Sequence, residues 1–138
     1  MNAITNWALG WAARAAVVLV MASAGTFSTA AAELLMFERE GCIWCARWNS
    51  EIAPVYPKSA EGQAAPLRRI DLVRTVGSDG ILARPVRYTP TFVLIDQGRE
   101  VGRITGYVSD DAFWGLLSNM LSSIRKDRDE AVLSSTME

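Results

Sequence analysis

Apolar positions from residue 33 onward fall into short runs that suit strands, separated by stretches that suit helices and turns. The run Leu34 to Phe37 predicts a strand over 33–37, and the stretch from Cys42 to about Ile52 predicts a helix. The polar stretch from Lys58 to Pro66 is expected to be a connection, and 77–80 a turn. Three further strands are expected where apolar and β-branched residues gather, at 67–73, 91–95 and 100–105.

A final helix is expected after Gly106. Ser109 is a suitable N-cap residue, and the two acidic residues after it suit the positive end of a helix dipole. Apolar residues then recur at steps of three and four, a spacing that predicts one buried helix face rather than a binding surface: Phe113, Leu116, Leu117, Met120 and Ile124. Residues 125–138 are polar and charged and are expected to form a flexible tail, so the folded domain should span 33–124.

Residues 1–32 have the pattern of a secretory signal peptide. Arg14 is the one charge between Trp7 and Ala32, a Val/Leu-rich run follows it, and Ala30 and Ala32 provide a small-residue cleavage site before Glu33. We expect cleavage after Ala32 and a periplasmic mature protein. An uncleaved membrane anchor is the alternative, and it would need Arg14 near one membrane interface.

Composition excludes several classes of function. The net charge is −1 and the arginines are interspersed with acidic residues, which argues against a nucleic-acid surface. The chain has no histidine, so Ser-His and Cys-His catalysis are excluded. It has only two cysteines, and a closed zinc site would need carboxylates or a second chain to complete it. Copper(I) held by two thiolates stays open as a metal-binding alternative.

The two cysteines form the motif Cys42-Ile43-Trp44-Cys45. A disulfide across two intervening residues constrains the unfolded chain weakly, so a purely structural bridge is the less favoured interpretation. The spacing favours redox chemistry, with Cys42 at the helix N-terminus as the nucleophile and Cys45, one turn deeper, as the resolving thiol. This chemistry needs no cofactor besides the two thiols.

The order of strands and helices, this motif, the run Thr89-Pro90-Thr91-Phe92 and Gly106 together resemble the thioredoxin fold. The resemblance implies an α/β fold: a central mixed sheet flanked by helices, with C-x-x-C at the N-terminus of the first helix. It also implies a cis-proline at Pro90 beside the cysteines. The short mature chain and the arginines before Thr89 further resemble the exported thioredoxin-like proteins linked to bacterial thiosulfate oxidation, the SoxS type.

The resemblance also implies how a substrate would bind. Pro90 would place the backbone of Thr89 for strand-like pairing with a bound protein, and Trp44 is a candidate aromatic contact, although it could equally cover the start of the helix. The charged residues that flank the dithiol, Glu38, Glu40 and Arg47, are expected to be a solvated rim.

The leading functional hypothesis is a thiol-disulfide reductase that keeps a partner protein's cysteines reduced. By resemblance, the partner would be a sulfur-carrier protein of thiosulfate oxidation, and a membrane thiol-disulfide transporter would supply electrons. A disulfide oxidase or isomerase is the alternative within the same fold. Isomerases usually work as dimers, whereas this chain is expected to be a monomer.

Overall fold

The computed structural model describes residues 32–74 and 80–137, so the expected signal peptide lies outside the described residues. The elements follow the order β1 (Glu33–Glu38), α2 (Ile43–Glu51), the 3₁₀ helix η1 (Tyr56–Lys58), α3 (Ala60–Ala64), β2 (Leu67–Asp71), β3 (Thr91–Asp96), β4 (Arg99–Thr105) and α4 (Asp110–Thr136). Within the described residues, no helix is both long enough and apolar enough to span a membrane.

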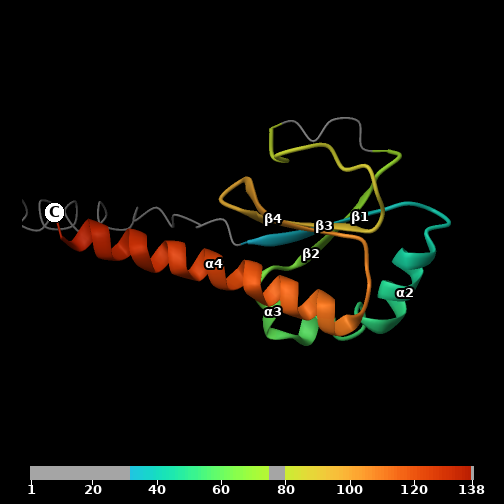
Figure 1. The fold of residues 1–138 in the computed structure, drawn as a ribbon, viewed down its shortest axis with the longest axis horizontal. Helices are drawn as coiled ribbons and strands as arrows, with labels where there is room; N and C mark the ends of the chain where they lie inside the picture. Colours follow the sequence, from blue (N-terminus) through green and yellow to red (C-terminus); the bar gives the residue numbers. More distant parts are fainter. Residues whose placement is uncertain (1–31, 75–79, 138) are drawn as a thin grey trace, which may run out of the picture.

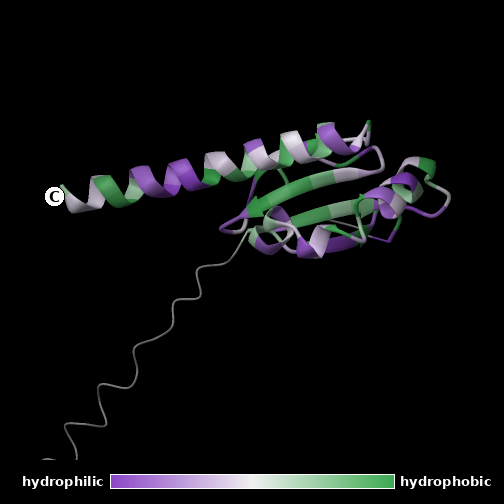
Figure 2. Ribbon diagram, turned by 90° about the horizontal axis from the view of Figure 1, so that it is seen from below, coloured by the Kyte–Doolittle hydropathy of each residue, from purple (hydrophilic) through white to green (hydrophobic). Residues whose placement is uncertain are grey.

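The strands of the described chain form one mixed sheet with the order β2-β1-β3-β4. β1 runs parallel to β2 and antiparallel to β3, and β3 forms a hairpin with β4. The middle strands are hydrophobic along their length, as the green of the central sheet in Figure 2 shows, while the helices lie along one side of the sheet in Figure 1. Strands that are buried on both faces need apolar residues at successive positions rather than at alternate ones.

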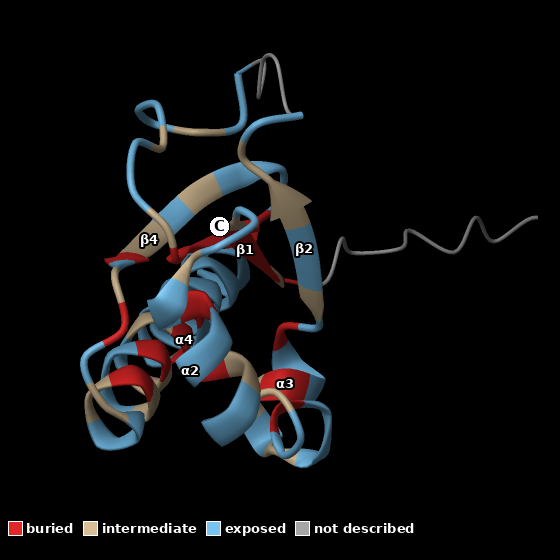
Figure 3. Ribbon diagram, turned by 90° about the vertical axis from the view of Figure 1, so that its right-hand side faces the viewer, coloured by how far each residue is buried: buried red, intermediate tan, exposed pale blue. Residues whose placement is uncertain are grey.

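Two hydrophobic clusters cover the two faces of the sheet. Alternate residues of β1 and β3, such as Met36 and Phe92, pack against the helices around the fully buried Trp48. The intervening residues, such as Phe37 and Val93, form a smaller cluster with residues from the segment between β2 and β3. Figure 3 shows the helices on one side of the sheet and residues 80–90 on the other. The predicted α/β fold with a central mixed sheet is confirmed.

The predicted elements differ from the observed ones at two places before β3. The stretch 58–66, expected to be a simple connection, contains α3, because the Ser59 side chain caps that helix by accepting from the Gly62 N–H at 2.9 Å. The strand expected over 67–73 ends at Asp71. Most of the turn expected at 77–80 lies outside the described residues.

The last helix begins as predicted, with the Ser109 side chain accepting from the Ala112 N–H at 3.2 Å. It does not end near Ile124. α4 continues to Thr136, so the segment expected to be a flexible tail is helical and runs past the end of the sheet (Figure 1). One physical reason is an ion pair at 2.5 Å between Arg128 and Asp96, whose side chain is only 9% exposed. Residue 124 is therefore not a structural boundary.

Candidate active site

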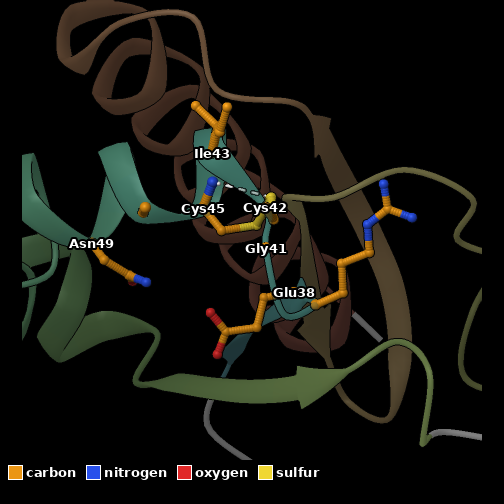
Figure 4. Close-up of a pocket in the computed structure, with 8 residues that line it drawn as sticks. Glu38, Gly41, Cys42, Ile43, Cys45 and Asn49 are labelled. Carbon is orange, nitrogen blue, oxygen red and sulfur yellow. Dashed lines mark hydrogen bonds between the residues drawn. A yellow bond between two sulfur atoms is a disulfide. The ribbon is translucent and has the colours of Figure 1, made fainter.

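The two cysteines lie where β1 turns into α2. Gly41, with a φ of +74°, makes this turn in a backbone conformation that favours glycine. Cys42 is the N-cap residue of α2, and its Sγ accepts a hydrogen bond from the Cys45 N–H at 3.2 Å. Figure 4 shows the disulfide that joins Cys42 to Cys45, whose Cα atoms lie 5.2 Å apart. The structure is therefore that of the oxidised state.

The two cysteines differ in their access to solvent. Cys42 is partly exposed, whereas Cys45 is 3% exposed and belongs to the core beneath the helix. A surface cavity of about 380 Å³ opens beside the pair, and Cys42, Ile43 and Cys45 are among the residues that line it (Figure 4). Cys42 is therefore the more accessible of the two cysteines to a partner's disulfide.

Glu38 and Asn49 face this cavity and are joined by an arginine that the sequence did not single out. One Arg69 Nη donates to the Glu38 carboxylate at 2.8 Å, and the other donates to Asn49 Oδ1 at 2.8 Å. The same guanidinium lies 5.7 Å from the ring centroid of Trp48, a cation–π arrangement. Glu38 is thus held in a network rather than lying free on a solvated rim. Arg69 lies opposite Met36 in the β1–β2 register, a long-range pairing that local pattern does not encode.

Arg47 and Glu51 form an ion pair at 2.9 Å on the outer side of α2. The Tyr107 hydroxyl donates to Glu51 at 2.5 Å, and this bond together with the Arg47 contact holds the pKa of Glu51 below its usual range. Burial, reinforced by the Glu51 carboxylate, raises the pKa of Tyr107. Arg47 also donates to the Val108 carbonyl at 3.3 Å, so this group ties α2 to the chain that leads into α4.

The sheet register brings Thr89 and Pro90 to the end of the sheet at which β1 leads into the cysteines. Phe37, near the end of β1, is paired with Thr91, which directly follows Pro90. The Thr89–Pro90 peptide bond is cis, Pro90 is buried and Thr89 is partly exposed. Trp44, in the first turn of α2, is 52% exposed.

No cluster of three or more potential metal ligands of the His, Cys, Asp or Glu type occurs within residues 32–74 and 80–137. The polar groups beside the two cysteines are the ion-paired Glu38 and the amide of Asn49. The two cysteines themselves can exchange electrons by switching between a disulfide and two thiols.

Comparison with known proteins identifies the family. The sequence profile of the thioredoxin-like domain matches residues 29–121, which is more than half of the chain. The chain belongs to the thioredoxin-like family. Its dithiol therefore makes it a thiol-disulfide oxidoreductase, as predicted from the C-x-x-C motif.

Solved structures of this family show the same relationship. The chain is 49% identical to the periplasmic thioredoxin SoxS from Paracoccus pantotrophus in its reduced form, with a TM-score of 0.62 over 66% of this chain and 96% of that one. A mutant thioredoxin from Halobacterium salinarum is 26% identical, with a TM-score of 0.51 over 66% of this chain and 75% of that one. The predicted resemblance to the SoxS type is confirmed. Curated protein sequences gave no match.

Proposed function

We propose that this thioredoxin-like protein is an exported, periplasmic reductase that uses Cys42 and Cys45 to reduce disulfides of a partner protein. The difference in exposure between the two cysteines carries the dithiol mechanism, with Cys42 as the attacking and Cys45 as the resolving thiol, since an attacking thiol must be accessible and a resolving thiol must be protected. The similarity to a periplasmic thioredoxin supports the compartment.

In the proposed cycle the Cys42 thiolate attacks one sulfur of the partner's disulfide, and the other partner sulfur leaves as a thiolate. The α2 N-terminus favours the Cys42 thiolate, because its backbone N–H groups point at the sulfur, as the contact from Cys45 N–H illustrates. Cys45 then attacks Cys42 Sγ and releases the second partner thiol. Two electrons have passed to the partner, and the protein is left with the Cys42–Cys45 disulfide that the structure contains.

Substrate positioning is assigned to Thr89, Pro90 and Trp44. Thr89 would pair with the partner's extended backbone, since the proline after it has no N–H to offer. The exposed face of Trp44 would contact the partner beside the disulfide. No further cofactor is proposed.

The proposed partner is a sulfur-carrier protein of thiosulfate oxidation, and a membrane thiol-disulfide transporter is the proposed electron donor. Both assignments come from the resemblance to the SoxS type, which the 49% identity to the Paracoccus protein supports. We propose that the protein acts as a monomer after cleavage between Ala32 and Glu33. Mass spectrometry of the exported protein checks the cleavage: an N-terminus at Glu33 is expected, and intact residues 1–32 in that fraction would contradict it.

Two measurements test the reductase proposal. The Cys45→Ser variant should accumulate partner proteins as mixed disulfides on Cys42, whereas Cys42→Ser should accumulate none and serves as the matched control. The reduction potential of the dithiol should lie near that of thioredoxin, about −270 mV, and a value near that of the strong periplasmic oxidant, about −120 mV, would instead indicate an oxidase.

A further inference from the structure

A second cavity, separate from the one beside the disulfide, lies between residues 80–89, the segment before Pro90, and strand β4. Its volume is about 370 Å³. No acidic side chain of the described chain lines it. Its lining is mostly arginines and hydroxyl-bearing residues: Arg84, Arg87, Tyr88, Thr91, Arg103 and Thr105. A cavity of this composition offers hydrogen-bond donors and positive charge, which suit a carboxylate.

Arg103 fixes the shape of this cavity. Its guanidinium makes two contacts of 2.8 Å with the Glu100 carboxylate, and both side chains are nearly buried, at 7% and 9% exposed. The same guanidinium donates to the Arg84 carbonyl at 2.7 Å. Glu100 in turn accepts from the Ala83 N–H at 2.8 Å. The buried ion pair therefore holds the backbone of the segment before Pro90 against the sheet.

A β-bulge makes this arrangement possible. Leu94 is paired with Gly102 but Ile95 with Glu100, so Val101 is an extra residue in β4. Residues three apart on a regular strand point to opposite faces, and the extra residue brings Glu100 and Arg103 to the same one. Thus both charges meet on the face that the segment before Pro90 covers.

Arg84 and Arg87 keep their charges available for a ligand. Both side chains are exposed, and neither has a salt bridge with an acidic residue in the parts of the chain that the structure describes. Glu100 is the acidic residue whose pKa Arg103 lowers and the charge of Arg84 helps to lower, but its carboxylate is already bound by Arg103 and the Ala83 N–H. The cavity therefore carries two uncompensated positive charges at its rim.

The position of the cavity indicates what would fill it. Arg87 precedes Thr89 by two residues, a separation of at most about 7 Å along the chain. A protein segment paired with Thr89 would therefore pass beside Arg87. The geometry points to an acidic side chain of the partner protein, a few residues from the disulfide that Cys42 attacks, binding in this cavity. This inference rests on the proposed function and adds a class of substrate to it.

The test uses three peptides of equal length, each closed by one disulfide, with glutamates, glutamines or lysines on either side of the cysteines. The full-length protein is reduced beforehand with dithiothreitol, which is then removed. Rate constants for peptide reduction are measured by acid quenching, alkylation and mass spectrometry. Wild-type protein should reduce the glutamate peptide about three- to tenfold faster than the glutamine peptide, the range that two exposed ion pairs provide. The difference should shrink as salt is added.

The variant R84E/R87E should lower this ratio to one or below. R99E is the matched control, because Arg99 is also an exposed arginine but lies at the opposite end of the β3–β4 hairpin from Thr105. It should keep the wild-type ratio. Thermal melting establishes that each variant is folded, and R84Q/R87Q replaces the charge-reversed protein if that one is not.

The outcomes separate the two proposals. An unchanged ratio in R84E/R87E, an equal loss in R99E, or no preference in the wild type would overturn the acidic-partner inference while leaving the reductase intact. Failure of wild-type protein to reduce any of the peptides would overturn both.

Discussion

Replacement of Arg103 by methionine should destabilise the protein far more than a matched change at an exposed ion pair. Arg103 and Glu100 make two parallel contacts of 2.8 Å with side chains only 7% and 9% exposed. Loss of one partner leaves a carboxylate uncompensated in a poorly solvated site, which typically costs about 3–5 kcal/mol of the free energy of unfolding. The lost hydrogen bond to the Arg84 carbonyl adds to this cost.

Arg68 provides the control. It also makes two contacts with a carboxylate, to Glu33 at 2.9 and 3.0 Å, but these side chains are 53% and 36% exposed. Arg68→Met should therefore cost less than about 1 kcal/mol, since water solvates whichever charge remains. Urea unfolding of the oxidised proteins, followed by tryptophan fluorescence, gives the two free energies on one scale.

Replacement of both Glu100 and Arg103 distinguishes two causes of the lost stability, the unpaired carboxylate and the missing hydrogen bonds to the backbone. In the double variant Glu100→Leu/Arg103→Met no charge is left unpaired, and most of the lost stability should return. Equal costs for Arg103→Met and Arg68→Met would refute the reasoning that burial of this pair anchors the segment before Pro90. A double variant as unstable as Arg103→Met would show that the hydrogen bonds to the backbone, rather than the unpaired carboxylate, dominate.

Two further predictions concern stability. The contacts from Arg103 lower the pKa of Glu100 in the folded state. The stabilisation that the ionised Glu100 provides is therefore present at neutral pH and is lost as the pH falls from the pKa in the unfolded chain, about 4.3, through the lower pKa in the folded protein. Glu100→Gln should flatten this part of the plot of unfolding free energy against pH, measured by urea unfolding. Gly62→Ala should lower the melting temperature, because the new Cβ would lie 1.8 Å from the Tyr56 carbonyl oxygen. Gly115→Ala should instead raise stability by up to about 1 kcal/mol, because a Cβ there would meet no side chain, and no backbone from beyond its own turns of α4, within 4 Å. A stabilising Gly62→Ala, or a destabilising Gly115→Ala, in the same melting experiment would contradict the packing described.

The features that the sequence predicted well depend on near neighbours in the chain. The Cys42–Cys45 pair is set by one helical turn, and the capping role of Ser109 by the N–H groups that follow it. The apolar run 91–95 predicted β3 because a strand buried on both faces needs little besides such a run. The helical continuation of α4 was missed because composition alone suggested a tail, whereas the partner of Arg128 lies on a distant strand.

The charged groups around the site could not be predicted in the same way. Arg69 reaches Glu38 and Asn49 only because β2 lies parallel to β1 in a particular register. Period-two alternation places Glu100 and Arg103 on opposite faces of β4, and the bulge at Val101 reverses that expectation. One inserted residue thus decides that a buried ion pair forms, that it holds the segment before Pro90, and that Arg84 and Arg87 stand at the rim of a cavity. The dithiol chemistry follows from local sequence, whereas the proposed recognition of an acidic partner depends on a register shift that only the folded sheet reveals.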